Sequence, residues 1–180
     1  MRHLIDRAMT GDPDAFNALA AHVGDDMFAI ARRILRDRER AADAVQATLL
    51  AIWRNLPKLR DPQRFDAWRY RLLVNECYRQ GRRERRERDG RQLAPPAPPH
   101  PDHASAIADR DAIERAFLRL SPQHRAVVVL HHYRGLPLVE VASTLGIPVG
   151  TAYSRLHYAQ ERLRSVLTEE IEPVTSRGMA

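Results

Sequence analysis

The sequence predicts an all-α protein in which two small helical domains are joined by a proline-rich linker. Apolar residues recur at three- and four-residue spacing through most of the 180-residue chain, as they do on the buried side of helices. The main β-branched run, residues 127–130, falls inside one of these helical patterns. Residues 92–108 contain five prolines and too few apolar side chains to build a core. The expected boundaries are 1–88 for the first domain, 89–108 for the flexible linker, 109–168 for the second domain and 169–180 for a disordered tail.

Two helices are expected at the start of the first domain, after a short lead-in over residues 1–11. Asp12 supplies a cap, a first-turn proline follows it, and Gly24 is expected to end this first helix. Asp25 or Asp26 then caps the second helix. The buried side of the second helix is expected to consist of Met27, Ile30, Ala31, Ile34 and Leu35.

A third helix, at about 39–56, has two distinct sides. Its buried side is expected to consist of Val45, Leu49, Ile52 and Leu56. Another side mixes a carboxylate, an amide, an arginine and an apolar residue: Asp43, Gln46, Ala47, Leu50 and Arg54. A solvated side more often carries charges throughout, so this side is a candidate protein-docking surface. A solvated side with one stray leucine remains the alternative.

A basic loop and a fourth helix follow. Residues 57–64 contain Lys58, Arg60 and Arg64, and an Asp-Pro pair within the loop starts the helix. Phe65, Leu72, Leu73 and Cys77 should be buried. Another side forms what we name the arginine row: Arg64, Trp68, Arg71, Asn75, Arg79, Arg82 and Arg86. An aromatic ring and an amide among arginines suit a nucleic-acid backbone and unstacked bases. Alternatively, the tryptophan belongs to the core and the arginines only solubilise the helix.

The second domain ends in a helix-turn-helix pattern at residues 137–167. Before it, a Ser-Pro start precedes a helix that Gly135 should end. The first helix of the pattern has an apolar side of Val139, Val141, Ala142 and Leu145. Gly146 and Pro148 form the turn, because one permits a left-handed conformation and the other cannot continue a helix. The apolar stripe then resumes as Ala152, Leu156, Ala159, Leu163 and Val166.

The opposite side of this last helix carries hydroxyls, aromatic rings and arginines. Its members are Thr151, Ser154, Arg155, Tyr158 and Arg162, with Tyr153 and His157 beside them. Such side chains suit phosphates and base edges in a DNA groove. The alternative is an ordinary helical hairpin whose polar side is merely solvated.

Charge and composition agree with a polyanionic partner. The net charge is +6, with 20 basic and 14 acidic residues in 1–91 and 8 basic and 5 acidic residues in 109–167. Cys77 is the only cysteine, which excludes an intrachain disulfide and fits a reducing cytoplasm. No apolar run approaches the roughly 20 residues of a bilayer span, so we expect no direct membrane insertion.

Taken together, these residues resemble the extracytoplasmic-function (ECF) sigma factors of the sigma-70 family. The resemblance covers about residues 11–167. In the first domain it rests on Gly11-Asp12, Ala15-Phe16, Ala41 to Gln46, Trp53-Arg54, Phe65 to Arg71 and Val74-Asn75. In the second it rests on Leu120 to Pro122, Arg125, Leu136, Glu140 to Ala142, Gly150-Thr151 and Ser154 to Leu156. The chain departs from the family at four positions. The family commonly has Glu at Ala42 and an aromatic residue at Leu59. It commonly has Leu at Arg69 and a basic residue at Tyr158.

The resemblance implies a sigma factor that directs RNA polymerase to promoters and takes part in DNA melting. The first domain would be region 2, with Asp43, Gln46, Ala47, Leu50 and Arg54 docking on core RNA polymerase. The −10 element would be bound by Lys58, Arg60, Arg64, Trp68, Arg71, Asn75 and Arg79, with an unpaired base captured as the duplex melts. The second domain would be region 4, with Tyr153, Ser154, His157 and Tyr158 facing bases of the −35 element. Thr151 lies on the same side, and Arg155 and Arg162 would contact phosphates.

The resemblance also implies a cytoplasmic protein, commonly held inactive by an anti-sigma factor. A stand-alone DNA-binding regulator is the alternative, but the sequence offers it no dimerisation or ligand-sensing element. Catalysis and metal binding are not expected. His131 and His132 point about 100° apart on a helix, so they cannot chelate together, and the remaining histidines offer no better set. We therefore expect no catalytic residue, no metal site and no cofactor.

Overall fold

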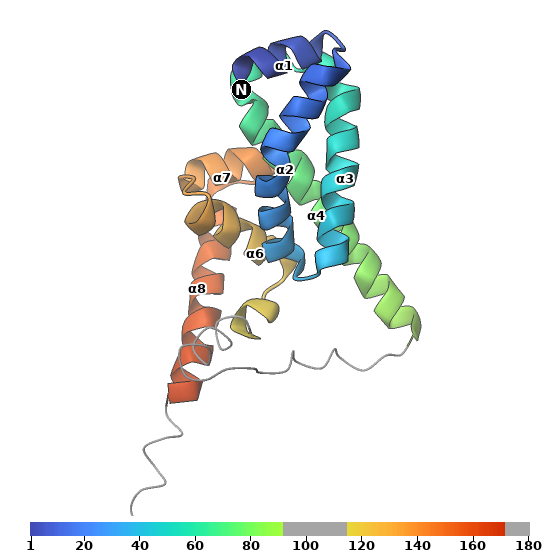
Figure 1. The fold of residues 1–180 in the computed structure, drawn as a ribbon. Coiled ribbons are helices and arrows are strands. Elements are labelled where there is room, and N and C mark those ends of the chain that lie inside the picture. The colour runs from blue at the N-terminus through green and yellow to red at the C-terminus, as the bar shows by residue number, and fades with distance from the viewer. Residues whose placement is uncertain (92–114, 172–180) are drawn as a thin grey trace, which may run out of the picture.

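The computed structural model describes residues 1–91 and 115–171, and every regular element within them is helical, which confirms the predicted fold class. The longer helices are α1 Arg2–Met9, α2 Pro13–Leu35, α3 Arg38–Asn55, α4 Phe65–Arg91, α6 Pro122–Val128, α7 Leu138–Leu145 and α8 Val149–Ile171 (Figure 1). Short helical turns at Leu56–Lys58, Pro62–Arg64 and Val129–Tyr133 connect them. Most of the expected linker and the end of the expected tail lie outside the described residues.

One long helix, α2, replaces the two that the sequence predicted. Asp12 caps it by accepting hydrogen bonds from the backbone N–H groups of Asp14 and Ala15, each at 3.0 Å. The expectation that Gly24 ends the helix was wrong. A mid-helix glycine costs only about 1 kcal/mol, and the burial of Val23 and Met27 on either side outweighs that cost.

The expected lead-in is also helical, forming α1. This helix buries Ile5 and Ala8 against α2, and Thr10 ends it by donating its hydroxyl to the carbonyl of Arg7 at 2.7 Å. An eight-residue helix is marginal in isolation, so packing on α2 is what stabilises it. The sequence interpretation missed it because no cap or breaker marks its start.

The helix α3 packs through a side that only partly matches the expected one: Ile52 and Leu56 are buried as predicted. Val45 and Leu49 are only half-buried, whereas Ala41, Ala44, Thr48 and Ile52 form the buried line. Small side chains on this line let α3 lie close to α2 and α4. Thr48 satisfies its hydroxyl by donating to the carbonyl of Ala44 at 2.6 Å, which permits its burial.

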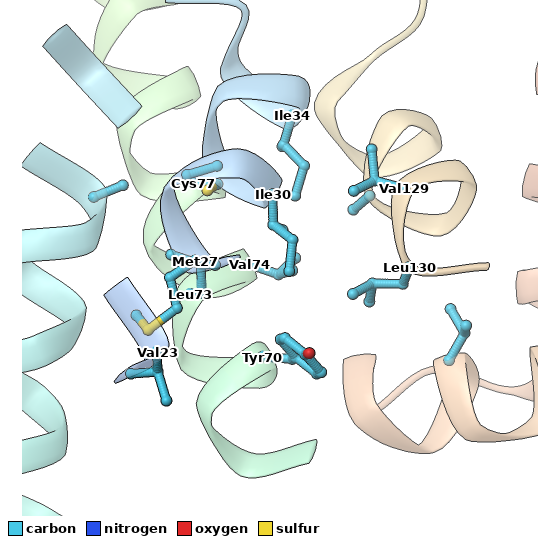
Figure 2. Packing of buried hydrophobic residues seen from close by; sticks show 14 of the residues in the cluster. Val23, Met27, Ile30, Ile34, Tyr70, Leu73, Val74, Cys77, Val129 and Leu130 are labelled. Atoms are coloured by element: carbon cyan, nitrogen blue, oxygen red, sulfur yellow. The ribbon is translucent and has the colours of Figure 1, made fainter. Parts of the chain in front are cut away.

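The first group of helices, α1 to α4, and the second group, α6 to α8, share one hydrophobic core. The elements α6 and Val129–Tyr133 contact α2, and both α6 and α7 contact α4. Figure 2 shows Val129 and Leu130 pointing toward Ile30 and Val74 across this junction. The sequence left the relative arrangement of the two domains open, and the structure packs them together.

Candidate nucleic-acid and polymerase interfaces

The side of α3 predicted to dock on a protein is available in the structure. Asp43, Gln46, Leu50 and Arg54 are exposed, and Ala47 is half-buried at the edge of this side. Leu50 is 50% exposed, and Trp53, one helical turn along, is 37% exposed and packs its ring on Phe16 with 4.8 Å between centroids. The side therefore combines an apolar platform with flanking polar groups, which is the usual make-up of a protein interface.

The basic loop presents its three cations at the surface, next to the start of α4. Asp61 accepts a hydrogen bond from the backbone N–H of Gln63 at 2.9 Å and so caps the turn Pro62–Arg64. The same carboxylate lies 3.5 Å from Arg64. Lys58 and Arg60 are exposed, so the loop offers positive charge without burying it.

Most of the arginine row is exposed along one side of α4. The exposed members are Arg64, Arg71, Asn75, Arg79, Arg82 and Arg86. Trp68 is half-buried and its ring lies 6.2 Å from that of Phe65, so it is part of the core as well as of the row. Arg79 already pairs with Glu76 through hydrogen bonds as short as 2.5 Å, which raise its pKa. It consequently has less charge to offer DNA than its neighbours.

The helix-turn-helix forms as predicted around its glycine. Gly146 adopts a left-handed conformation with φ of 65°, and the N–H of Ile147 then bonds back to the carbonyl of Ala142 at 3.0 Å. Val139 was expected on the apolar side, but it is 59% exposed. Leu138 is buried in place of Val139. The buried residues of α7 are Leu138, Val141, Ala142 and Thr144.

The helix α8 separates an inner stripe from an outer polar side, as expected. Ala152, Leu156 and Ala159 are buried and Leu163 is half-buried. On the outer side Tyr153, Ser154, His157, Tyr158 and Arg162 are exposed, whereas Thr151 and Arg155 are half-buried. The structure therefore leaves five of the seven predicted −35 residues exposed.

Two residues of α8 contact the rest of the chain in ways that the sequence did not indicate. The ring of Tyr158 packs on His124 of α6, with 4.5 Å between centroids. Burial, together with the positive charge of Arg155, lowers the pKa of His124. Burial raises the pKa of Tyr78, on α4, to about 12, and Arg155 partly opposes this increase. Arg155 thus lies close to α4 as well as to α6.

A polar cluster, buried at Arg69 and Tyr70 and open to solvent at Arg134, joins α2, α4 and the turn before α7. We name it the Asp26 cluster, and it consists of Asp26, Arg69, Tyr70 and Arg134. Arg69 is only 5% exposed and donates to Asp66 at 2.7 Å and to Asp26 at 3.0 Å. Burial alone would lower the pKa of Arg69, but these hydrogen bonds raise it above its ordinary value. No helical periodicity could have revealed the cluster, because Asp26 and Arg134 lie 43 and 64 positions away from Arg69 and Tyr70 respectively.

A second arginine is buried where α6 meets the first group of helices. Arg125 is 9% exposed, and its Nε has no hydrogen-bond partner among the described residues. Burial and the nearby charge of Arg36 lower its pKa to about 10, whereas Glu84 of α4 raises it. Arg125 therefore lies between the end of α2 and α4, within reach of charges from both.

A groove of about 380 Å³ separates the start of α4 from α7. Its walls comprise Gln63, Arg64, Asp66, Ala67 and Tyr70 on one side and Leu136, Glu140, Ser143 and Thr144 on the other. Deeper along α4, Arg71 reaches the turn of the helix-turn-helix: a Cβ atom placed on Gly146 would lie 2.9 Å from its Nη2. The first half of the arginine row is therefore bordered by the second group of helices.

Within the described ranges, 1–91 and 115–171, the chain has neither a membrane-spanning helix nor a cluster of metal ligands. No helix there combines the length and apolar character needed to cross a bilayer. No three histidine, cysteine, aspartate or glutamate side chains come together there as a metal site would require.

Comparison with known proteins matches both groups of helices. Residues 19–87 match sigma-70 region 2 and residues 116–165 match sigma-70 region 4. The ECF RNA polymerase sigma factor SigL of Mycobacterium tuberculosis is 36% identical over 143 residues, covering 77% of this chain and 81% of SigL. The ECF RNA polymerase sigma factor SigW of Bacillus subtilis is 25% identical over 178 residues, covering 92% and 95% of the two chains.

Two solved structures resemble this one across most of its length. The sigma factor RpoE of Bartonella quintana, in complex with the anti-sigma factor NepR, has a TM-score of 0.69 at 26% identity and covers 85% of this chain and 96% of RpoE. CnrH, in complex with the cytosolic domain of CnrY, has a TM-score of 0.66 at 28% identity and covers 93% and 97%. The chain therefore belongs to the ECF sigma factors of the sigma-70 family, regulatory DNA-binding proteins that act with RNA polymerase in transcription initiation.

Proposed function

We propose that the chain divides the work of a sigma factor between residues 1–88 and residues 109–168, joined by a linker at 89–108. The first part binds core RNA polymerase through α3. The observation that carries this assignment is the half-exposed Leu50 beside Trp53, on a helix whose other side is fully packed. An apolar platform of this kind, rimmed by Asp43, Gln46 and Arg54, is costly to leave in water and is stabilised when a partner covers it.

The arginine row and the loop before it bind the −10 element and help to melt it. Lys58, Arg60 and Arg64 are exposed just before the start of α4 and supply charge to the phosphates. Trp68 combines a packed ring with a partly exposed surface, which suits stacking by an unpaired base. Glu76 neutralises Arg79, so we assign Arg79 the weakest role in the row.

The second part binds the −35 element through α8 in the major groove. Tyr153, Ser154 and His157 are exposed near the start of the helix, where side chains of a recognition helix meet base edges. Arg162 lies two turns further along and is exposed, so it contacts a phosphate rather than a base. Tyr158 is held on His124, so it contributes a fixed ring to the same surface.

The chain acts in the cytoplasm and has no catalytic activity of its own. Nothing in the Asp26 cluster resembles an activated nucleophile, because its one carboxylate, Asp26, is paired with Arg69 and Arg134. An anti-sigma factor is a further expected partner. Two proteins that share this fold are solved in complexes: RpoE with the anti-sigma factor NepR, and CnrH with the cytosolic domain of CnrY.

The test is run-off transcription with purified core RNA polymerase on genomic fragments, with and without the protein. New, discrete start sites are expected, and their upstream sequences would define the −10 and −35 elements. As a control, the same core polymerase must be active with another sigma factor. Under that condition, DNA binding without new start sites would instead favour the stand-alone regulator.

A further inference from the structure

We propose that a pocket between α4 and residues 121–123 binds a small ligand that carries a diphosphate group. The pocket has a volume of about 290 Å³ and shares no lining residue with the groove between α4 and α7. This binding site goes beyond the proposed function, because a diphosphate ligand is neither promoter DNA nor a protein partner.

One wall of the pocket carries three guanidinium groups. Arg82, Arg85 and Arg86 are three and four residues apart, so α4 places them on one side. All three are exposed, and none pairs with a carboxylate among the residues whose side chains the structure describes. Arg79, one turn earlier, differs because Glu76 neutralises it. The described lining also contains no aspartate or glutamate, so the pocket attracts an anion with more than one charge.

The opposite wall supplies neutral polar groups. Ser121 and Gln123 line it. The hydroxyl oxygen of Ser121 accepts a hydrogen bond from the backbone N–H of His124 at 3.4 Å and lies 2.6 Å from Nδ1 of the same residue, which fixes its position. The amide of Gln123 has two N–H donors. Guanidinium groups on one wall and an amide on the other match the several acceptor oxygens of a phosphate group.

Tyr78 completes the lining without adding negative charge. Burial raises the pKa of its phenol to about 12, so it stays neutral, and Arg155 partly opposes this increase from nearby. Gly81 and Pro122 mark the place where the two walls meet, because a Cβ atom on Gly81 would lie 3.3 Å from Cγ of the proline. The arginines therefore border a hollow rather than a flat basic surface.

The size of the hollow favours a small ligand over a duplex. A sphere of this volume is about 8 Å across, which is less than the width of about 12 Å of the DNA major groove alone. Pockets for small molecules begin at about 300 Å³, so this one suits a compact group. A phosphate monoester carries about −1.5 to −2 charges, and a diphosphate carries more, which is a closer match to three arginines.

The test is calorimetric titration of the full chain with sodium pyrophosphate at an ionic strength of about 0.15 M. Charges more than about 8 Å apart are largely screened under these conditions, so binding requires close contacts. We expect one site, and Arg85→Glu should weaken it by about tenfold or more, because the change replaces an attraction by a repulsion. Arg85→Lys should weaken it less, since it keeps the charge but loses the two-pronged contact. Arg32→Glu reverses an exposed arginine on α2 and should have no effect.

A second variant tests the hollow without changing any charge. Gln123→Trp should fill the pocket and also weaken binding by about tenfold or more, and circular dichroism checks that each variant keeps its helices. Proton NMR supplies a local signal at His124, whose pKa is lowered by burial and by Arg155. A bound anion beside Ser121 should raise that pKa in the parent but not in Arg85→Glu.

Titration with a nucleoside diphosphate distinguishes the two sources of the group. Equal affinity for it and for pyrophosphate would mean that the diphosphate alone is bound, whereas tighter binding would identify a nucleotide.

Four results would overturn the proposal: no binding of either diphosphate, equal weakening by Arg32→Glu, no effect of Gln123→Trp, or equal binding of the nucleoside without phosphates. If pyrophosphate does not bind but Arg85→Glu weakens duplex binding, the arginines contact a DNA backbone instead.

Discussion

The Nε of Arg134 donates to the hydroxyl of Tyr70 at 2.9 Å, although the two residues are 64 positions apart in the chain. The bond joins a turn of the region 4 match to the central helix of the region 2 match. With Arg69 as a second donor and Asp26 as acceptor, the phenol oxygen has all of its hydrogen-bonding capacity in use. A polar group so fully satisfied at a junction fixes one arrangement of the two domains.

Replacing Leu50 and Arg54 together by alanine should weaken binding to core RNA polymerase by about tenfold or more. Truncating an apolar anchor at the centre of an interface typically costs 1 kcal/mol or above, at roughly tenfold per 1.4 kcal/mol. Fluorescence anisotropy with labelled core enzyme measures the affinity. Leu118→Ala is the control, since Leu118 is a 43% exposed leucine elsewhere. Unchanged affinity in the double variant would remove α3 as the docking helix.

Replacing Ser154 and His157 should change the preferred −35 sequence, whereas Arg162→Ala should weaken binding to all sequences equally. A base contact contributes about 1–3 kcal/mol of discrimination, and a phosphate contact contributes to the salt slope. Selection from randomised −35 duplexes measures the preference, and titration at several salt concentrations measures the slope. For Arg162→Ala the slope should fall by about one. An altered base preference in that variant would mean that Arg162 reads sequence.

The change Arg69→Leu should destabilise the protein by about 2–3 kcal/mol, because it leaves the Asp26 carboxylate without its buried partner. Urea unfolding measures the loss. Arg32→Leu, at an exposed position on α2, should change little. The double variant Arg69→Leu, Asp26→Leu should recover part of the stability. If the single variant were as stable as the parent, the cluster would have no structural role.

Asp12→Ala should lower the thermal midpoint at pH 7 and have little effect in acid. Backbone hydrogen bonds from the start of α2 and the nearby Arg7 lower the pKa of Asp12 below its ordinary value of 3.8. A lowered folded-state pKa stabilises the protein above the unfolded pKa, and this contribution is lost as the pH falls through the folded value. The difference between the melting temperatures of parent and variant should therefore shrink as the pH falls below 3.8. A difference in melting temperature that stayed constant with pH would show that the charge of Asp12 does not contribute to stability.

Cys77 should react about a thousandfold more slowly with a disulfide reagent in the folded protein than in urea. Burial raises the pKa of its thiol from 9.0 to about 12, so the reactive thiolate is scarce near neutral pH. Absorbance of the released thiolate at pH 8 follows the reaction. A rate close to that of the unfolded chain would show that the core opens readily around α4.

Local signals in the sequence predicted the elements that depend on local chemistry. The cap at Asp12 and the turn at Gly146 both formed as expected, since each acts within a few residues. Gly24 misled the interpretation, because burial of its neighbours decides whether a glycine ends a helix. The buried side of α3 was predicted only in part: Ile52 and Leu56 are buried, but Ala41, Ala44 and Thr48 replace Val45 and Leu49, because small side chains can be buried as readily as larger ones when helices lie close.

The arrangement of the domains could not be predicted, for a physical reason. Periodicity tells which side of a helix is buried, but it does not tell what covers it. Arg69 shows the limit well: its pairing with Asp66 lies within one helical turn, but Asp26 is 43 residues away. The exposure of the predicted DNA-binding residues followed the pattern, whereas the half-burial of Thr151 and Arg155 depends on packing that no single helix reveals.

The position of α3 determines an order of assembly. This helix lies on the side of α2 away from α7 and α8 (Figure 1), and Leu50 stays half-exposed while the domains are packed together. On the proposed assignment, polymerase can capture the factor before any promoter is present. Docking through α3 therefore requires no change in how the two domains are packed.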